Sequence, residues 1–359
     1  VRTFLLKGFI PLVLFILMVA GTAQLFKMTP SSLVPDEDQG FYIAVAILPD
    51  GATLRRTQEV VKEVQEAVRS NPANKDIVSF AGFDFLGNGY KNNVATFFIT
   101  QKPWDERDMD SKALVGDFFM KTGHIDEALV LAFNPPAIMG LGSAGGFEFY
   151  IQDQGRQGHE ALQGAMGAFM GAAYQSPLLG GGGGQIFAAW KPNTPQLKLD
   201  LDQEQAKLMG VSTSSVFQTL SATLGSYYIN DFSYKGRLWQ VLLSADPEFR
   251  MTPDDILRIP VPNAEGRMVS LSAIADIKYV SGPDTLERFN NLLAVKIQGE
   301  GAPGVASSDV LNEIARIGAT LPPGFGIDWA GASLQEVRSS GSSNFAFIAA
   351  ILMVFLILA

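Results

Sequence analysis

Two uninterrupted apolar stretches lie near the ends of the chain. Residues 8–26 carry no charge and are about long enough to cross a ~30 Å hydrocarbon layer, which predicts a transmembrane helix within residues 1–27. A cleaved signal peptide is the alternative, but it would need a shorter apolar centre and a small-residue cleavage site, which residues 24–27 do not offer. Residues 345–359 are apolar throughout, which predicts the start of a second, truncated transmembrane helix in preference to a buried core helix.

The charges beside the first apolar stretch predict its orientation. Arg2 and Lys7 precede the stretch, whereas the acidic run Asp36-Glu37-Asp38 follows it. Because basic residues concentrate on the cytoplasmic side, the N-terminus is expected in the cytoplasm and the region between the two stretches outside it. Neither stretch contains an ionisable residue, so a proton relay within the membrane is expected to lie outside this chain.

The region after the first stretch alternates between strand and helix patterns. In residues 53–69, Val60, Val61 and Val64 recur at helical spacing and predict an amphipathic helix. Strands are expected at residues 41–48, 76–85, 94–100 and 128–133, and a second helix at residues 111–120. This βαββαβ order is the ferredoxin-like pattern.

A second region shows the same order of elements, divided into two parts. Its strands are expected at residues 147–152, 185–190, 292–298 and 326–330, and its helices at residues 159–174 and 307–317. The two βαβ halves lie far apart in the sequence, so another segment is inserted between them.

The inserted segment, residues 194–286, contains both kinds of element. Leu197, Leu199 and Leu201 alternate with charged residues and predict a half-buried strand. The other elements expected here are a helix at residues 214–224 and a β-hairpin of strands at residues 226–232 and 238–244. Since strands and helices both occur throughout, the expected fold class is α+β.

The charge and composition of the chain exclude several classes of function. The formal net charge is −9 and the sequence pI is about 4.9, without a cluster of Lys and Arg, which argues against a nucleic-acid partner. The chain has no cysteine, which excludes disulfides, thiolate metal sites and cysteine nucleophiles.

Seven motifs occur in an order and spacing that resemble one transporter family. They are PDEDQG (35–40), GFDFLGNG (82–89), AFNPPAI (132–138), TPQLKLDLDQE (194–204), GSYYINDF (225–232), GR (236–237) and RMTPDDI (250–256). Each motif is weak alone, but together they cover most of the chain. They make it similar to the second half of resistance-nodulation-division efflux pumps of the hydrophobe/amphiphile branch.

The resemblance implies a division into subdomains. Residues 28–145 would form a first porter subdomain, and residues 146–193 with 287–331 a split second one, both ferredoxin-like. Residues 194–286 would form an inserted docking subdomain, and residues 332–344 a link towards the membrane.

The resemblance also implies a mode of action. Such pumps are secondary transporters of the inner membrane, not enzymes, and their large domain lies in the periplasm. They are homotrimers that work with a periplasmic adaptor protein and an outer-membrane channel, and export hydrophobic or amphiphilic small molecules by alternating access. The implied energy source is the proton gradient, and no cofactor is expected.

The GFDFLGNG motif is the first candidate site. Gly87 and Gly89 can take a positive φ at little cost, which would let the segment move. Phe83 and Phe85 offer flat apolar faces that suit unrelated ligands. On the residues alone, an ordinary hairpin turn whose aromatics fill a core is the better interpretation. The resemblance instead implies a switch loop, with Gly82, Gly87 and Gly89, between two substrate pockets.

Further candidate residues follow from the resemblance. Those matching the outer access pocket are Leu131, Phe133, Pro135 and Lys191. A core strand is the alternative for Leu131 and Phe133, and a plain surface charge for Lys191. Val78 and Thr96 stand where well-known family members have aromatic residues in the deep pocket, so the inner pocket is expected to be less aromatic.

Other patterns do not support a metal or nucleotide site. Residues 180–184 are all glycine but lack the lysine of a phosphate loop, so a flexible loop is expected. His159 begins like a zinc-protease motif without its second histidine, and residues 36–38 lack calcium-loop spacing and are expected to be solvated. Met166 and Met170 lie one turn apart and are expected to pack in a core rather than bind copper.

Two alternative functions stay open. A pump of the same family could export metal ions or lipids, which would require Met or carboxylate clusters facing the cleft between the two porter subdomains. A membrane-anchored adaptor or binding module could use the hairpin near Tyr227 and Trp239 for assembly alone.

Overall fold

The computed structural model describes residues 9–28, 37–138, 140–142, 144–188 and 190–340, together with 350, 352–354 and 356–357. The chain divides into two compact units. The second unit is Asn193–Gly282, and the first contains the chain on either side of it. The second apolar stretch, residues 345–359, lies largely outside the described residues.

The first apolar stretch forms helix α2 (Phe9–Met28), as its pattern predicts. Among the residues that the structure describes, however, no helix combines the length and the apolar character needed to cross a membrane. The helical prediction is therefore confirmed for residues 9–26, whereas Gly8 lies outside the described residues; the transmembrane prediction is not confirmed.

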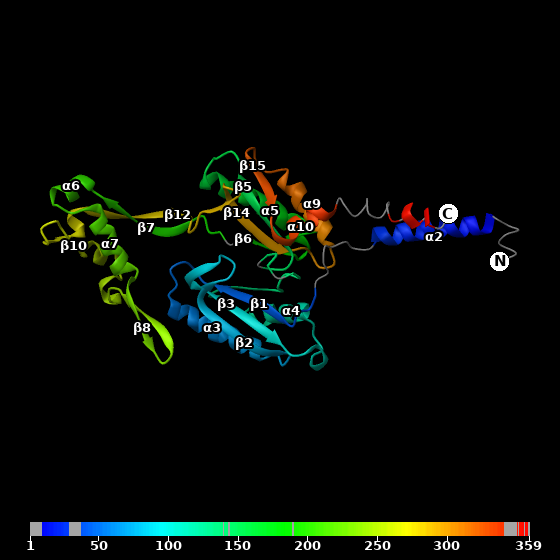
Figure 1. Ribbon diagram of the computed structural model, residues 1–359, viewed down its shortest axis with the longest axis horizontal. Helices are drawn as coiled ribbons and strands as arrows, with labels where there is room; N and C mark the ends of the chain where they lie inside the picture. The colour runs from blue at the N-terminus through cyan, green and yellow to red at the C-terminus, as the bar shows by residue number, and fades with distance from the viewer. Residues whose placement is uncertain are drawn as a thin grey trace. The chain divides into compact units, whose positions relative to one another are not determined.

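The first unit contains a four-stranded antiparallel sheet, whose first strand begins at Phe41. Its strands are β1 (Phe41–Ile47), β2 (Asn74–Asp84), β3 (Gly89–Gln101) and β4 (Leu129–Phe133), in the order β2-β3-β1-β4. Helix α3 (Leu54–Arg69) follows β1, and helix α4 (Ser111–Thr122) precedes β4 (Figure 1). The predicted βαββαβ order is present.

One face of this sheet packs against α3 and α4. Val60 and Val64 of α3, Leu114 of α4, and Phe97 and Ile99 of β3 belong to one buried cluster. Because successive strand residues point to opposite faces, the intervening residues of β1 and β3 form the helix-free face. The helical spacing of the valines in α3 predicts that this helix packs one apolar face against a core.

Asp38 differs from the prediction that residues 36–38 are solvated. Its carboxylate accepts hydrogen bonds from the backbone N–H groups of Gly40 (3.0 Å) and Ser111 (2.8 Å), and it pairs with Arg107 at 2.8 Å. Partial burial disfavours the charge, but these donors outweigh burial and lower the pKa of the Asp38 carboxyl. The side chain therefore holds the segment that enters β1 against the start of α4.

A second antiparallel sheet is assembled from both parts of the first unit. Its strands are β5 (Phe147–Asp153), β6 (Gln185–Ala188), β13 (Glu287–Phe289), β14 (Leu292–Glu300) and β15 (Phe325–Trp329). Strand β14 pairs with β5, β6 and β13, and β15 pairs with the other edge of β5. The predicted strands of both βαβ halves are present in this sheet, together with β13, which the sequence pattern did not predict.

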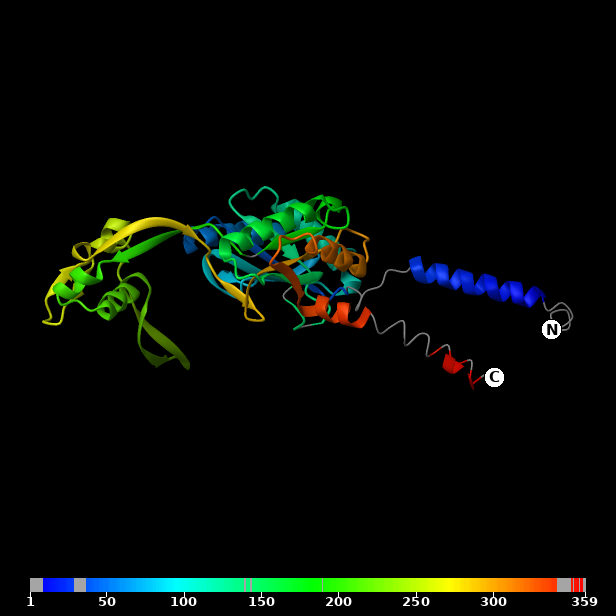
Figure 2. The same cartoon turned by 90° about the horizontal axis from the view of Figure 1, so that it is seen from above.

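Helices α5 (His159–Gln175) and α9 (Ser307–Gly318) lie side by side on the second sheet (Figures 1 and 2). Phe149, Phe169 and Ile314 are buried between the helices and the sheet. Met166 and Met170 pack against the same cluster, which confirms their predicted role in the core. Helix α10 (Gly331–Ser340) follows β15 and contacts β5 and α9.

The glycine run at residues 180–184 differs from the flexible loop that was expected. It forms a short 3₁₀ turn, η2 (Gly180–Gly182), whose backbone packs closely on its surroundings. A Cβ at Gly182 would collide with the carbonyl of Pro177, and one at Gly184 would lie 2.7 Å from the carbonyl of Glu300. The glycines are therefore required by close backbone approach.

The second unit, Asn193–Gly282, has its own small core around Val216, Val261, Leu271 and Ile274. Its strands are β7 (Thr194–Leu201), β8 (Tyr227–Tyr234), β9 (Arg237–Leu243), β10 (Pro260–Pro262), β11 (Met268–Ser270) and β12 (Ala275–Gly282). Its helices are α6 (Gln203–Leu208), α7 (Thr213–Leu224) and α8 (Pro253–Leu257). The predicted strand, helix and β-hairpin of this segment are confirmed.

Candidate functional site

The helix-free face of the first sheet carries a second apolar cluster. Its buried members are Ile43, Val45, Leu86 and Phe133, and Phe41, Phe85, Phe98, Leu131, Ala144 and Phe187 pack against them. Phe187 comes from β6 of the second sheet, so the cluster joins the two sheets of the first unit. A sheet face without its own helix layer is therefore covered partly by residues distant in sequence.

Five aromatic rings form a continuous series on this face, which we call the aromatic face: Phe80, Phe83, Phe85, Phe98 and Phe133. The Phe80 ring meets the rings of Phe83 and Phe98 edge to face, with centroids 6.3 and 6.0 Å apart. Phe85 meets Phe98 at 5.7 Å and stacks on Phe133 at 6.4 Å. Such offset and edge-to-face pairs are favourable geometries. The Phe80 end of the series is half exposed, whereas Phe133 is buried.

Phe80 and Phe98 are two members of the aromatic face that the sequence reasoning missed. Val78 is half exposed on β2, and Phe80 follows it two residues later on the same face. Thr96 and Phe98 stand in the same relation on β3. Period-two alternation in the strands could have identified both phenylalanines. The inner surface is therefore more aromatic than Val78 and Thr96 alone suggested.

The GFDFLGNG motif forms the hairpin between β2 and β3. Phe83 lies in β2, and Gly89 begins β3, so the connecting turn consists of residues 85–88. Gly87 and Gly89 could take a positive φ at little cost, but the positive values of this motif occur at Gly82 (89°) and Asn88 (50°). The register between the strands shifts beside Gly82, and a bulge of this kind requires an unusual backbone angle.

Gly87 lies close to the side chain of Asp84. Its backbone N–H donates a 2.8 Å hydrogen bond to the Asp84 carboxylate, and a Cβ at this position would collide with that carboxylate. The Asp84 side chain thus closes the turn over Gly87. No such restriction applies at Gly89, where the nearest atom to a built Cβ is 3.9 Å away.

Thr96 fixes the hairpin from the neighbouring strand. Its hydroxyl donates a 2.7 Å hydrogen bond to the carbonyl of Phe83 and accepts a 3.3 Å bond from the N–H of Phe85. The Thr96 side chain is fully buried, so both bonds are shielded from water. Thr96 therefore positions the two phenylalanines instead of adding an aromatic ring to the pocket.

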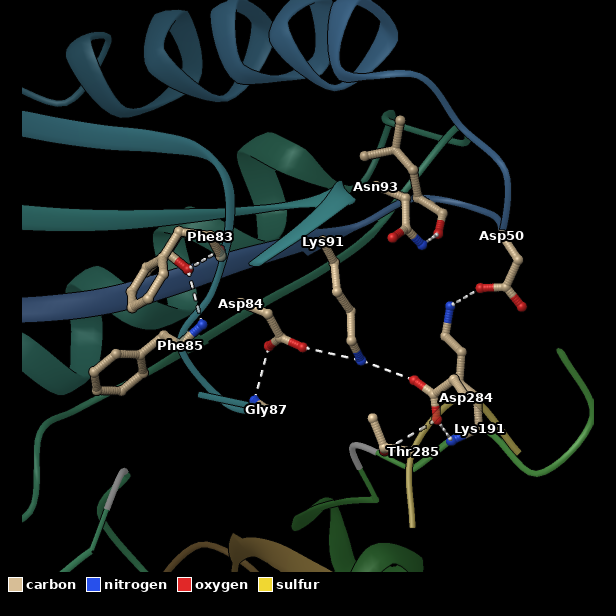
Figure 3. A network of polar contacts seen from close by, with 12 residues as sticks. Asp50, Phe83, Asp84, Phe85, Gly87, Lys91, Asn93, Lys191, Asp284 and Thr285 are labelled. Atoms are coloured by element: carbon tan, nitrogen blue, oxygen red, sulfur yellow. Dashed lines mark hydrogen bonds and ion pairs between the residues drawn. The ribbon is translucent and has the colours of Figure 1, made fainter. Parts of the chain in front are cut away.

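A line of charged side chains leads away from the hairpin (Figure 3). Lys91 Nζ lies 3.3 Å from Asp84 and 2.8 Å from Asp284, a residue 193 positions further along the chain. Burial disfavours the ammonium charge, but the two carboxylates outweigh burial and raise the pKa of Lys91. Figure 3 shows Asp84 directed towards Lys91, while the rings of Phe83 and Phe85 point to the other side of the hairpin.

Lys191 is placed near this charged line. Its Nζ pairs with Asp50 at 2.6 Å, and its backbone N–H and C=O both bond to Asp284 (Figure 3). The side chain is about one-third exposed. Lys191 is thus a partly exposed, paired charge.

A cavity of about 260 Å³ lies between elements of the two sheets in the first unit. It is lined by Phe119, Leu131, Tyr174, Gly184, Gln185, Ile186 and Phe187. Leu131 and Phe187 also belong to the apolar cluster under the aromatic face, so cavity and face adjoin. Of the predicted access-pocket residues, Leu131 lines this cavity, whereas Phe133 and Pro135 are buried and Lys191 is not part of its wall.

Comparison with known proteins identifies the family. A family model described as the AcrB/AcrD/AcrF family matches residues 1–359. The multidrug export protein AcrF of Escherichia coli K12 is 39% identical over 97% of this chain, and multidrug resistance protein MdtF of the same strain is 36% identical over 97%. The toluene efflux pump membrane transporter TtgB of Pseudomonas putida is 35% identical over 99%.

The matches cover nearly all of this chain but only 34% of each of these relatives. The chain thus spans about a third of the length of the curated relatives it matches. The resemblance carried by the seven motifs is confirmed, and the chain belongs to the AcrB/AcrD/AcrF family of resistance-nodulation-division efflux transporters.

Proposed function

We propose that the protein containing this chain is an inner-membrane multidrug efflux transporter that exports hydrophobic and amphiphilic small molecules. The observation that carries the proposal is the aromatic face beside the 260 Å³ cavity. Aromatic rings give large apolar contact with few directional demands, so such a surface accepts chemically unrelated ligands. The names of the relatives point the same way: AcrF is a multidrug export protein, MdtF a multidrug resistance protein and TtgB a toluene efflux pump membrane transporter.

In this proposal the two sheets of the first unit are the ferredoxin-like porter subdomains. Residues 28–145 form the first, and residues 146–193 with 287–331 form the second. Substrate enters at the cavity wall near Leu131 and passes the hairpin that carries Phe83 and Phe85. Alternating access corresponds to opening and closing of the space between the two sheets.

The inserted unit, residues 194–286 in this proposal, is a docking subdomain for assembly. Its β8–β9 hairpin exposes a row of large apolar side chains: Tyr227, Tyr228, Ile229, Phe232, Leu238, Trp239 and Leu242. An exposed apolar surface of this kind favours burial against another protein. We propose a homotrimer that works with a periplasmic adaptor and an outer-membrane channel, with the large domain in the periplasm.

Transport is driven by the proton gradient in this proposal, and the protein is not an enzyme. Proton relays in membranes need ionisable side chains within helices, where they are costly and therefore functional. The described residues of α2 before Lys27 are uncharged, so we assign the relay to other parts of the full-length protein. The metal-exporting alternative gains no support from Met166 and Met170, because both pack in the second core.

The test is Phe85→Ala in the full-length protein, expressed in cells that lack their own multidrug pumps. Phe85 contacts both Phe98 and Phe133, so its loss removes the centre of the aromatic face. Resistance to large aromatic compounds should fall by about two- to tenfold, and resistance to small compounds should fall less.

The matched control is Met120→Ala, which removes an exposed apolar side chain of α4 in the first unit, outside the aromatic face. This variant should leave the whole susceptibility panel as in the wild type. Unchanged susceptibility in Phe85→Ala cells at normal protein abundance would count against the proposal.

A further inference from the structure

Lys91 lies on β3, just after the hairpin that carries Phe83 and Phe85, and it contacts two carboxylates from separate parts of the chain. Asp84 belongs to the hairpin itself, and Asp284 belongs to the segment that returns from the inserted unit. The side chains of Asp84 and Asp284 are only 7% and 15% exposed, and that of Lys91 is 28% exposed. All three charges are therefore largely withdrawn from water.

Asp284 is in turn bonded to the segment that leads into the inserted unit. Its N–H donates to the carbonyl of Lys191 at 3.1 Å, and its carboxylate accepts the N–H of Lys191 at 3.4 Å. Trp190 Nε1 also donates to the carbonyl of Thr285 at 2.8 Å. We call residues 190–192 and 283–286 the paired crossover segments, because the chain passes through them between its two units.

The charge balance of this network makes Lys91 its central member. Two carboxylates with little exposure share one ammonium group, and removing that group would leave both without a nearby opposite charge. An uncompensated buried charge is strongly unfavourable, so the carboxylates would have to move into water. A movement of Asp84 opens the turn at Gly87, and a movement of Asp284 disturbs the pairing with Lys191.

We propose that Lys91 is a positioning residue that couples the Phe83–Phe85 hairpin to the paired crossover segments, so that the two change conformation together. A consequence that rests on the proposed transport function is that displacement of the crossover segments changes the positions of Phe83 and Phe85 in the aromatic face. The coupling itself is a property of the described residues and can be measured without transport.

Amide hydrogen exchange measures the coupling directly. In Lys91→Met, the amides of Phe85 and Gly87 in the hairpin and of Asp284 in the crossover segments should all exchange about tenfold faster. Asp284→Asn should likewise accelerate exchange at Gly87, although the two residues are distant in sequence. Lys91→Arg keeps the charge and should restore slow exchange at both places.

The matched control is Lys121→Met. Lys121 has a similar exposure, 31%, and pairs with Asp117 within helix α4 at 3.1 Å. Its loss should leave exchange at Phe85, Gly87 and Asp284 unchanged.

Three outcomes would overturn the coupling: faster exchange in the hairpin alone, no change at either place, or an equal acceleration across the core amides of β1 and β3. The last result would indicate a general loss of stability. In the full-length protein, Lys91→Met and Asp284→Asn should change resistance with the same dependence on compound size as Phe85→Ala, and Lys91→Arg should not. A wild-type protein without export would refute the proposed function and leave the exchange result intact.

Discussion

The hydroxyl of Thr96 and the backbone carbonyl of Phe83 are joined by a 2.7 Å hydrogen bond between neighbouring strands. The same hydroxyl accepts the N–H of Phe85, so one small buried side chain satisfies two backbone groups beside the turn. A larger aromatic residue at this position could not make these bonds. On β3, Thr96 therefore fixes the hairpin by hydrogen bonds, and Phe98, two residues later on the same face, belongs to the aromatic face.

Thr96→Val should loosen the hairpin. The substitution keeps the shape of the side chain but leaves the carbonyl of Phe83 and the N–H of Phe85 without their partner. Because an unsatisfied buried polar group costs roughly 1–3 kcal/mol, we expect the free energy of unfolding to fall by about 2 kcal/mol. Urea denaturation measures this loss.

Thr100→Val is the control for this prediction, because Thr100 lies on the same strand and its hydroxyl bonds to Asp76 at an exposed position. Its effect should be below about 0.5 kcal/mol. Equal losses in the two variants would show that Thr96 has no special role.

Phe98→Leu should weaken binding of flat aromatic ligands. Phe98 meets both Phe80 and Phe85 edge to face, and leucine keeps most of its apolar volume without the ring. We expect the dissociation constant of the fluorescent probe N-phenylnaphthylamine to rise about two- to tenfold. Phe249→Leu, an exposed ring of the inserted unit, should leave it unchanged. An unaltered constant for Phe98→Leu would exclude this ring from the binding surface.

Glu313 should make stability depend on acidic pH. Its carboxylate accepts two hydrogen bonds from Arg316 and one from Ser176, each at 2.7 Å, which connects α9 to the end of α5. The bonds from Arg316 and then Ser176 lower the pKa of Glu313 from its ordinary 4.5 to about 2. The folded state thus favours the charged form, and this contribution is complete above the ordinary pKa and is lost as pH falls towards the lowered one.

Glu313→Gln tests this assignment. The difference in unfolding free energy between wild type and variant should be largest near neutral pH and should shrink between about pH 5 and pH 2. Glu59→Gln serves as control, because Glu59 and its partner Arg55 are 61% and 90% exposed and such pairs contribute little. A constant difference across the acid range would contradict the predicted linkage.

Gly182→Ala should destabilise the second sheet. The added Cβ would collide with the carbonyl of Pro177 and lie 2.7 Å from the Ala302 side chain. Because backbone cannot yield as a flexible side chain does, we expect the free energy of unfolding to fall by at least about 2 kcal/mol.

Gly171→Ala in α5 is the control and should not destabilise the protein, because no atom outside the local helix backbone lies within 4 Å of the new Cβ. Because alanine has a higher helix propensity than glycine, the free energy of unfolding should then rise by up to about 1 kcal/mol. Similar thermal unfolding of both variants would refute the close-packing explanation.

The sequence alone was sufficient for most helices and strands of the two sheets, although the short strand β13 was not predicted. Val60, Val61 and Val64 recur with the period of a helix and are buried on α3, and the split βαβ pattern appears again in the second sheet. Local periodicity predicts these helices and strands because each of them buries one face in a core, which makes apolar residues recur with the period of the helix or strand. The motif resemblance likewise predicted the family.

The sequence did not determine the conformation of the candidate site. The sequence allowed a positive φ at any glycine of the motif, but a shift of strand register places it at Gly82, and register is a property of two paired strands. Phe80 and Phe98 were overlooked because a search for missing aromatics at Val78 and Thr96 does not show which neighbours share their face.

Sequence by itself determined the main elements, their order, the inserted segment and the family, since each depends on local pattern or motif spacing. Only the tertiary structure decided which charges meet. Lys91 and Asp284 are 193 residues apart, and no local pattern relates them until the two sheets of the first unit come together. Contacts of that length arise from packing, so the connection from the Phe83–Phe85 hairpin to the crossover segments is visible only in three dimensions.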